Sequence, residues 1–259
     1  MRIFLVFLFL GIHAFTLDAQ SNLPELQQLK RWLSRADTLN AFSEDKNNGL
    51  AAIEEANEKI QRNLRRILLS PSLRKQDPRR LLSHPFLHIT GSPDGKFWTF
   101  QWYENNGGSW AMYSTMFWYR PANGPTRIHY ITASTEEPGL CGNSAVYHHI
   151  YSLPSAKKSL YLCVGDGKSC NTCSFSVAAV VDMSHTDFSF QYPAYTHDQS
   201  SCYTLEYRLG DLHGFLFHPK TKILDIDYDT DDLTPEGEAP KRRMHRSFRF
   251  QNGFFVVNQ

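Results

Sequence analysis

The sequence predicts an α+β protein in which a short helical element precedes a mostly antiparallel β-meander. Three observations support this fold class. Apolar residues recur every three or four positions up to residue 85, the period then changes to two, and short turns rich in Gly, Asn, Asp and Pro separate the later segments. Strands joined by such short turns are antiparallel, because parallel neighbours need a crossover of about a dozen residues. We expect the meander to form a sandwich or a partial propeller.

The N-terminus has the pattern of a secretory signal peptide. Arg2 is followed by the apolar run 3–12, and the small residue Ala19 marks the expected cleavage point. A membrane span needs roughly 20 apolar residues, and this run is shorter. We therefore expect residues 1–19 to be removed and the mature chain to be soluble, periplasmic or secreted, without stable membrane insertion.

Residues 20–85 are predicted to form helices that pack on the sheet of a β domain at 86–259. One helix follows Asn22, and a clearer one has its apolar face between Leu50 and Ile67 and ends at Ser70. The candidate strands are 86–90, 96–103, 110–119, 127–133, 145–153, 159–164, 174–182, 203–209, 214–218, 222–228, 244–250 and 253–257. The turn sequences between them include 92–95, 105–108, 165–167 and 252–253.

The composition is near neutral in charge and rich in aromatic residues. The formal net charge is +1, which argues against a general nucleic-acid binder, since those proteins are usually strongly basic. Trp98, Trp102 and Trp110 lie close together beside a Gly-rich turn. An exposed aromatic row of this kind can stack on a sugar or a peptide, and these residues are our candidate ligand site. The alternative is that the row belongs to the core, beneath the helices.

Segments 92–102 and 107–112 together resemble a group of uncharacterised exported proteins from Gram-negative bacteria. In that group a helical N-terminal segment precedes a hairpin with the pattern DGK, strand, W-x-x-x-x-GG, strand. Segments 220–226 and 250–255 are similar to the closing strands of the same group. The resemblance covers about a third of the chain, and it implies export and a β-rich fold but no activity.

The cysteines are expected to form one or two disulfides with a thiol left over, as is usual in an oxidising compartment. The five candidates are Cys141, Cys163, Cys170, Cys173 and Cys202. Cys170 and Cys173 form a C-x-x-C, which is also compatible with a redox dithiol or half of a zinc site. A strand follows it instead of a helix, and no second metal-ligand pair is evident. A bond from Cys163 across the predicted turn 165–167 to one of these two cysteines is the simplest pairing.

An acidic segment near the C-terminus is the candidate metal site. Asp225, Asp227, Asp229 and Glu236 match positions of a calcium-binding loop, but Thr230 replaces the glycine that such a loop needs at its sharp turn. The alternative is a strand whose aspartates share one solvated face. We expect no cofactor other than this candidate calcium ion.

No catalytic motif is evident in the sequence, so we predict an exported, non-catalytic binding module for a peptide, glycan or protein ligand. The alternative is an extracytoplasmic hydrolase whose site assembles only in the fold, around Cys141, His148 or His149, and Asp166. As neighbours on a strand, the two histidines are expected to point to opposite faces of the sheet.

Overall fold

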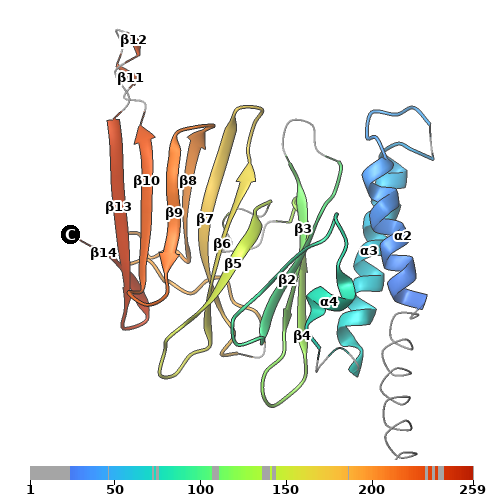
Figure 1. Ribbon diagram of the computed structural model, residues 1–259, viewed down its shortest axis with the longest axis horizontal. Coiled ribbons are helices and arrows are strands. Elements are labelled where there is room, and N and C mark those ends of the chain that lie inside the picture. The colour runs from blue at the N-terminus through green and yellow to red at the C-terminus, as the bar shows by residue number, and fades with distance from the viewer. Residues whose placement is uncertain are drawn as a thin grey trace, which may run out of the picture. The chain divides into compact units, whose positions relative to one another are not determined.

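The computed structural model describes residues 24–45, 47–71, 73, 76–106, 111–135, 141, 144–185, 187–230, 233–234, 237–238 and 242–258. The expected signal peptide therefore lies outside the described residues. The chain divides into two compact units, one of residues up to Ile89 together with Glu104–Asn106, and one of Thr90–Tyr103 and the residues from Gly107 onward. Figure 1 shows the elements of both.

The first unit contains the predicted helices. They are α2 (Pro24–Thr38), α3 (Leu50–Leu69) and the short α4 (Pro78–Leu82). The apolar positions at helical spacing are buried except Leu50, which is 50% exposed. Helix α3 ends where Ser70 adopts an extended conformation before Pro71, a conformation that the proline ring favours. Asp77 caps α4 by accepting a hydrogen bond from the Arg79 backbone N–H at 2.9 Å. The segment 104–106 is held to these helices by Asn105, whose side-chain amide donates to the carbonyl oxygens of Ala36 and Leu39.

The second unit consists of three four-stranded antiparallel sheets, apart from the first two residues of β1, which belong to the first unit. The first sheet is β1 (His88–Gly91), β2 (Phe97–Tyr103), β3 (Tyr113–Tyr119) and β4 (Arg127–Ile131). The second is β5 (Val146–Leu153), β6 (Leu160–Lys168), β7 (Cys173–Asp182) and β8 (Cys202–Arg208). The third is β9 (Leu212–His218), β10 (Ile223–Thr230), β13 (Arg242–Gln251) and β14 (Phe254–Val257). The two-residue strands β11 (Leu233–Thr234) and β12 (Gly237–Glu238) pair with each other.

Within each four-stranded sheet the strands lie in chain order, so the predicted antiparallel meander is confirmed (Figure 1). The three sheets pack face to face through two apolar clusters. One joins the first sheet to the second and includes Phe97, Phe117, Ile131, Tyr147, Ile150, Cys163, Val177 and Val181. The other joins the opposite face of the second sheet to the third and includes Leu160, Leu162, Val180, Phe217, Leu224, Ile226, Phe248 and Phe255. The second sheet is therefore covered on both faces.

A buried amide connects the first and second sheets. Gln101 is fully buried, and its side-chain N–H groups donate to the Thr115 hydroxyl at 3.0 Å and to the Ala145 carbonyl oxygen at 2.6 Å. Its carbonyl oxygen accepts from the Tyr147 backbone N–H at 2.8 Å. The Gln101 side chain thus supplies hydrogen-bond partners to two backbone groups at the start of β5, which lie among apolar residues.

The prediction of a turn at 165–167 was wrong, because β6 continues to Lys168 and the hairpin turns at 169–172. The two glycines serve close packing within the strand. A Cβ atom on Gly165 would collide with the Val146 carbonyl oxygen, and one on Gly167 would collide with the ring of Phe175. Glycine in a strand interior often marks a place where another group approaches the backbone closely. The sequence alone does not distinguish such a glycine from one in a turn.

Candidate binding face on the third sheet

The aspartates of the predicted acidic segment lie on β10 and alternate with core residues. Leu224 and Ile226 are fully buried against the second sheet. Asp225, Asp227 and Asp229 therefore point to the other face, because successive side chains of a strand alternate between faces. This is the solvated strand face that the sequence offered as the alternative to a calcium loop.

Each of these aspartates is paired with a histidine from a neighbouring strand. His218 Nε2 lies 3.2 Å from Asp225 Oδ2, His245 Nδ1 lies 3.0 Å from Asp227 Oδ1, and His213 Nε2 lies 2.8 Å from Asp229 Oδ2. His245 stands directly opposite Asp227 in the β10–β13 register, whereas a register shift beside Asp227 leaves His213 outside the regular β9–β10 pairing. We call the six residues His213, His218, Asp225, Asp227, Asp229 and His245 the His/Asp face.

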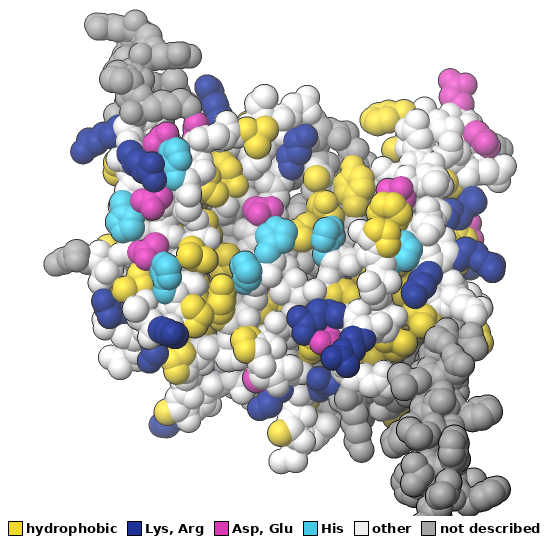
Figure 2. Space-filling view, viewed as in Figure 1, with side chains coloured by type: hydrophobic (Ala, Val, Ile, Leu, Met, Phe, Trp, Pro, Cys, Tyr) yellow, Lys and Arg dark blue, Asp and Glu magenta, His cyan; other side chains and the backbone are white. Residues whose placement is uncertain are grey.

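The His/Asp face is partly open to solvent, and its least exposed pair is His213 and Asp229, at 31% and 21%. The side chains of His245 and Asp227 are 58% and 40% exposed. Figure 2 shows histidine and aspartate side chains interspersed on the side of the molecule that carries β9, β10 and β13, with basic side chains nearby. In the β10–β13 pairing, Arg249 stands opposite Ile223, and Arg243 stands opposite Asp229. Both guanidinium groups therefore lie on the same face.

These residues can accept and donate hydrogen bonds side by side on a sheet whose opposite face is packed core. Carboxylates accept, guanidinium groups donate, and imidazoles do either according to their tautomer. Among the described residues no three His, Cys, Asp or Glu side chains are placed to hold a metal ion. Glu236 of the candidate calcium loop lies outside the described part of the chain, and the loop's first six positions form straight β-strand, not a turn around an ion.

The candidate aromatic row lies elsewhere, on the first sheet. Trp98 is 3% exposed and Trp102 is 1% exposed, while Trp110 lies outside the described residues. Trp102 stacks on Tyr130 of β4 in the same sheet, with ring centroids 5.8 Å apart. Two of the three rings are therefore inaccessible to a ligand, which corrects their assignment to a ligand site and agrees with the alternative that the row is core.

The expectation that His148 and His149 point to opposite faces was wrong. Tyr147 and Ile150 both pack in the cluster between the first and second sheets, although they are three positions apart. A β-bulge between Tyr147 and His149 accounts for this, since it adds one residue to β5. Both histidines are consequently exposed on the other side of the strand.

Only part of the predicted hydrolase set assembles. His148 Nε2 lies 3.1 Å from Asp166 Oδ2, but His149 stacks on Tyr151. Cys141 is bonded to Cys202, so its sulfur is not available as a nucleophile.

The His148–Asp166 pair predicts a pH effect. The hydrogen bond with Asp166 raises the pKa of His148 above the ordinary value of 6.5. Because the folded pKa is raised, the pair stabilises the fold at low pH, and this contribution is lost as the pH rises through the folded pKa. Both side chains are about half exposed, so we expect an effect below about 1 kcal/mol. In an NMR titration Asp166→Asn should lower the pKa of His148, and an unchanged titration would show that the pair does not form in solution.

Four of the five cysteines form two disulfides. Cys141 pairs with Cys202, 61 positions away, and Cys170 pairs with Cys173. Cys163 is a fully buried free thiol, which corrects the prediction that it bonds across the hairpin. It pairs with Ala179 in the middle of the β6–β7 ladder, whereas the C-x-x-C lies at the far end of the same hairpin. Burial raises the pKa of the Cys163 thiol well above its usual range, so the group is unreactive.

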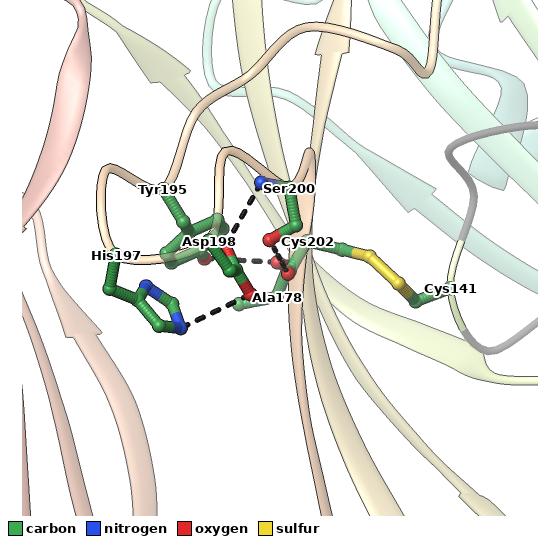
Figure 3. Close-up of a disulfide and its surroundings, with 7 residues drawn as sticks. All are labelled: Cys141, Ala178, Tyr195, His197, Asp198, Ser200 and Cys202. Carbon is green, nitrogen blue, oxygen red and sulfur yellow. Dashed lines mark hydrogen bonds and ion pairs between the residues drawn. A yellow bond between two sulfur atoms is a disulfide. The ribbon is translucent and has the colours of Figure 1, made fainter.

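The first disulfide has serine, histidine and aspartate side chains beside it (Figure 3). His197 Nε2 lies 3.2 Å from Asp198 Oδ2, and the Ser200 backbone N–H donates to Asp198 at 2.9 Å. The Ser200 hydroxyl, however, donates to the Cys202 carbonyl oxygen at 2.6 Å. The hydroxyl is therefore engaged with backbone instead of the imidazole, and the group is a structural turn beside the disulfide.

Comparisons with known proteins add no further assignment. No family model matches the chain, and searches of curated proteins and of solved structures give no match. Within the described residues, no helix is long and apolar enough to cross a membrane.

Proposed function

We propose that the protein is an exported, non-catalytic binding module whose ligand docks on the His/Asp face. One observation carries this proposal: three carboxylate–imidazole pairs, partly buried to exposed, lie on a sheet whose opposite face is core. Side chains held by a packed sheet need little reordering when a ligand binds, which lowers the entropic cost of recognition.

The arrangement favours an oligosaccharide as the ligand. β10 and β13 each pair with strands on both sides, so their backbone groups are engaged and recognition on this face falls to side chains. A peptide that binds by strand addition needs a free sheet edge. Sugar hydroxyls, by contrast, both donate and accept, so they can pair with carboxylates, which accept, and with imidazoles, which do either according to their tautomer. Phe254, paired across from Gln251 and 37% exposed, adds an aromatic ring at the margin of the sheet, where it stacks on Tyr192 with ring centroids 6.0 Å apart.

The proposal that the protein is exported rests on its N-terminal sequence and on its disulfides. Disulfides persist in oxidising compartments such as the periplasm and are rare in the cytosol. Two disulfides in a chain with five cysteines are consistent with an extracytoplasmic location. The N-terminal pattern and the resemblance to exported β-rich proteins support the same location.

Binding to a panel of oligosaccharides, measured by calorimetry and by NMR of the histidine side chains, tests the proposed function. The double variant Asp227→Ala with His245→Ala removes one carboxylate–imidazole pair and should weaken the binding of any responding member by about 10- to 100-fold, the effect of losing hydrogen bonds to charged groups. Tryptophan fluorescence is a poor reporter here, because Trp98 and Trp102 are buried.

The matched control is His148→Ala with Asp166→Ala, which removes a carboxylate–imidazole pair of similar exposure on the second sheet. This control should bind like the wild type. A panel without any response, or equal weakening by both double variants, would remove support for the His/Asp face as the ligand site.

A further inference from the structure

The C-x-x-C disulfide lies at the tip of the β6–β7 hairpin. Cys170 and Cys173 are partly exposed with Cα atoms 4.7 Å apart, and the two residues between them, Asn171 and Thr172, are exposed. The other disulfide has a different setting, since its Cys141 is also partly exposed but its Cys202 is only 4% exposed. A thiol reagent in solution can therefore approach the hairpin tip more easily than it can approach Cys202.

The hairpin is held by backbone hydrogen bonds as well as by this disulfide. The β6–β7 ladder pairs every residue from Leu160↔Asp182 to Lys168↔Ser174. Beyond the ladder, the backbone N–H groups of Ser169 and Cys170 both donate to the Cys173 carbonyl oxygen, at 3.1 and 3.3 Å. The turn is also tied to the β8–β9 connection, where the Leu209 N–H donates to the Thr172 carbonyl oxygen at 3.0 Å. These backbone bonds should hold the two sulfurs near each other in the reduced state as well.

One of the two sulfurs is placed to carry negative charge. The Thr172 backbone N–H donates to Cys170 Sγ at 3.3 Å, and the Thr172 hydroxyl lies 3.6 Å from the same sulfur. Hydrogen bonds to a thiolate stabilise it and make it a better leaving group in thiol–disulfide exchange. These two contacts favour Cys170 over Cys173 as the leaving thiolate.

We propose that Cys170 and Cys173 form a reversible thiol–disulfide exchange site that accepts two electrons from a dithiol while the Cys141–Cys202 bond stays oxidised. The thiolate of the dithiol attacks Cys173 Sγ, the Cys170–Cys173 bond breaks, and its electron pair leaves on Cys170 Sγ beside Thr172. The second thiolate of the reagent then attacks the reagent sulfur of the mixed disulfide and releases Cys173. The products are one oxidised dithiol and two protein thiols, and the two protons lost by the reagent balance those gained by the protein. This activity is independent of ligand binding on the His/Asp face.

The test is reduction of the purified, folded full chain with increasing dithiothreitol, followed by alkylation and mass spectrometry of each cysteine. We expect Cys170 and Cys173 to be labelled first, with the circular dichroism spectrum unchanged, and oxidised glutathione to restore the bond. Cys163, Cys141 and Cys202 should stay unlabelled until the protein is denatured. Reduction of Cys141–Cys202 before or together with the hairpin pair, or unfolding on reduction of the hairpin pair, would overturn the proposal.

A pair of variants tests the role assigned to Thr172. Thr172→Val removes the hydroxyl and keeps the backbone N–H, and the resulting rise in the Cys170 thiol pKa should slow cleavage by dithiothreitol about threefold. Thr172→Ser keeps the hydroxyl and should react at the wild-type rate. Equal rates for Thr172→Val and the wild type would contradict the leaving-group role of Cys170.

Discussion

Replacing both Cys141 and Cys202 with alanine is expected to lower the free energy of unfolding by about 4 kcal/mol. The bond joins residues 61 positions apart, so its loss restores much freedom to the unfolded chain. Cys202 lies at the start of β8 beside the core between the first two sheets, so the variant also loses packing there. Equilibrium unfolding in guanidinium chloride, followed by circular dichroism, measures the change.

The matched control is Cys170→Ala with Cys173→Ala. This bond joins residues only three positions apart, and closing so short a loop restricts the unfolded chain by only about 2 kcal/mol. If the two double variants are destabilised equally, loop length does not govern the contribution of the disulfides in this protein.

Gln101→Leu is expected to destabilise the fold by about 2–5 kcal/mol, because it leaves the Ala145 carbonyl oxygen and the Tyr147 N–H buried without the partner that they have now. The leucine is close to glutamine in size, so lost hydrogen bonding outweighs any change in packing. The same unfolding measurement applies.

Gln251→Leu makes the same substitution at an exposed position of β13 and should change the free energy of unfolding by less than about 0.5 kcal/mol. A small effect of Gln101→Leu, comparable with this control, would mean that water or a shifted backbone replaces the amide between the first two sheets.

The helices and the strand order could be predicted because they depend on local periodicity. The alternation of Leu224 and Ile226 with the aspartates of β10 was likewise enough to predict a solvated face. Pairing of His218 with Asp225 was also within reach, since a short turn connects β9 to β10.

Other parts of the site depend on register over longer distances, which the sequence does not show. His245 reaches Asp227 only through the β10–β13 pairing, and a long connection separates those two strands. The bulge beside His148 likewise depends on how β5 meets Gly165 of the next strand. The pairing of Cys141 with Cys202 depends on the fold. The spacing of the five cysteines along the sequence could not distinguish this pairing from the others.

The last sheet separates the residues that hold the fold from those that meet solvent. Leu224, Ile226 and Phe248 pack in the core beneath it. Asp225 and Asp227, which alternate with Leu224 and Ile226 along β10, contribute little to that core. Substitutions at exposed positions usually change stability by no more than about 0.5 kcal/mol. The residues of the His/Asp face can therefore be replaced with little loss of stability. Its binding specificity can change one side chain at a time, in evolution or in a designed library, while the core beneath it keeps the protein folded.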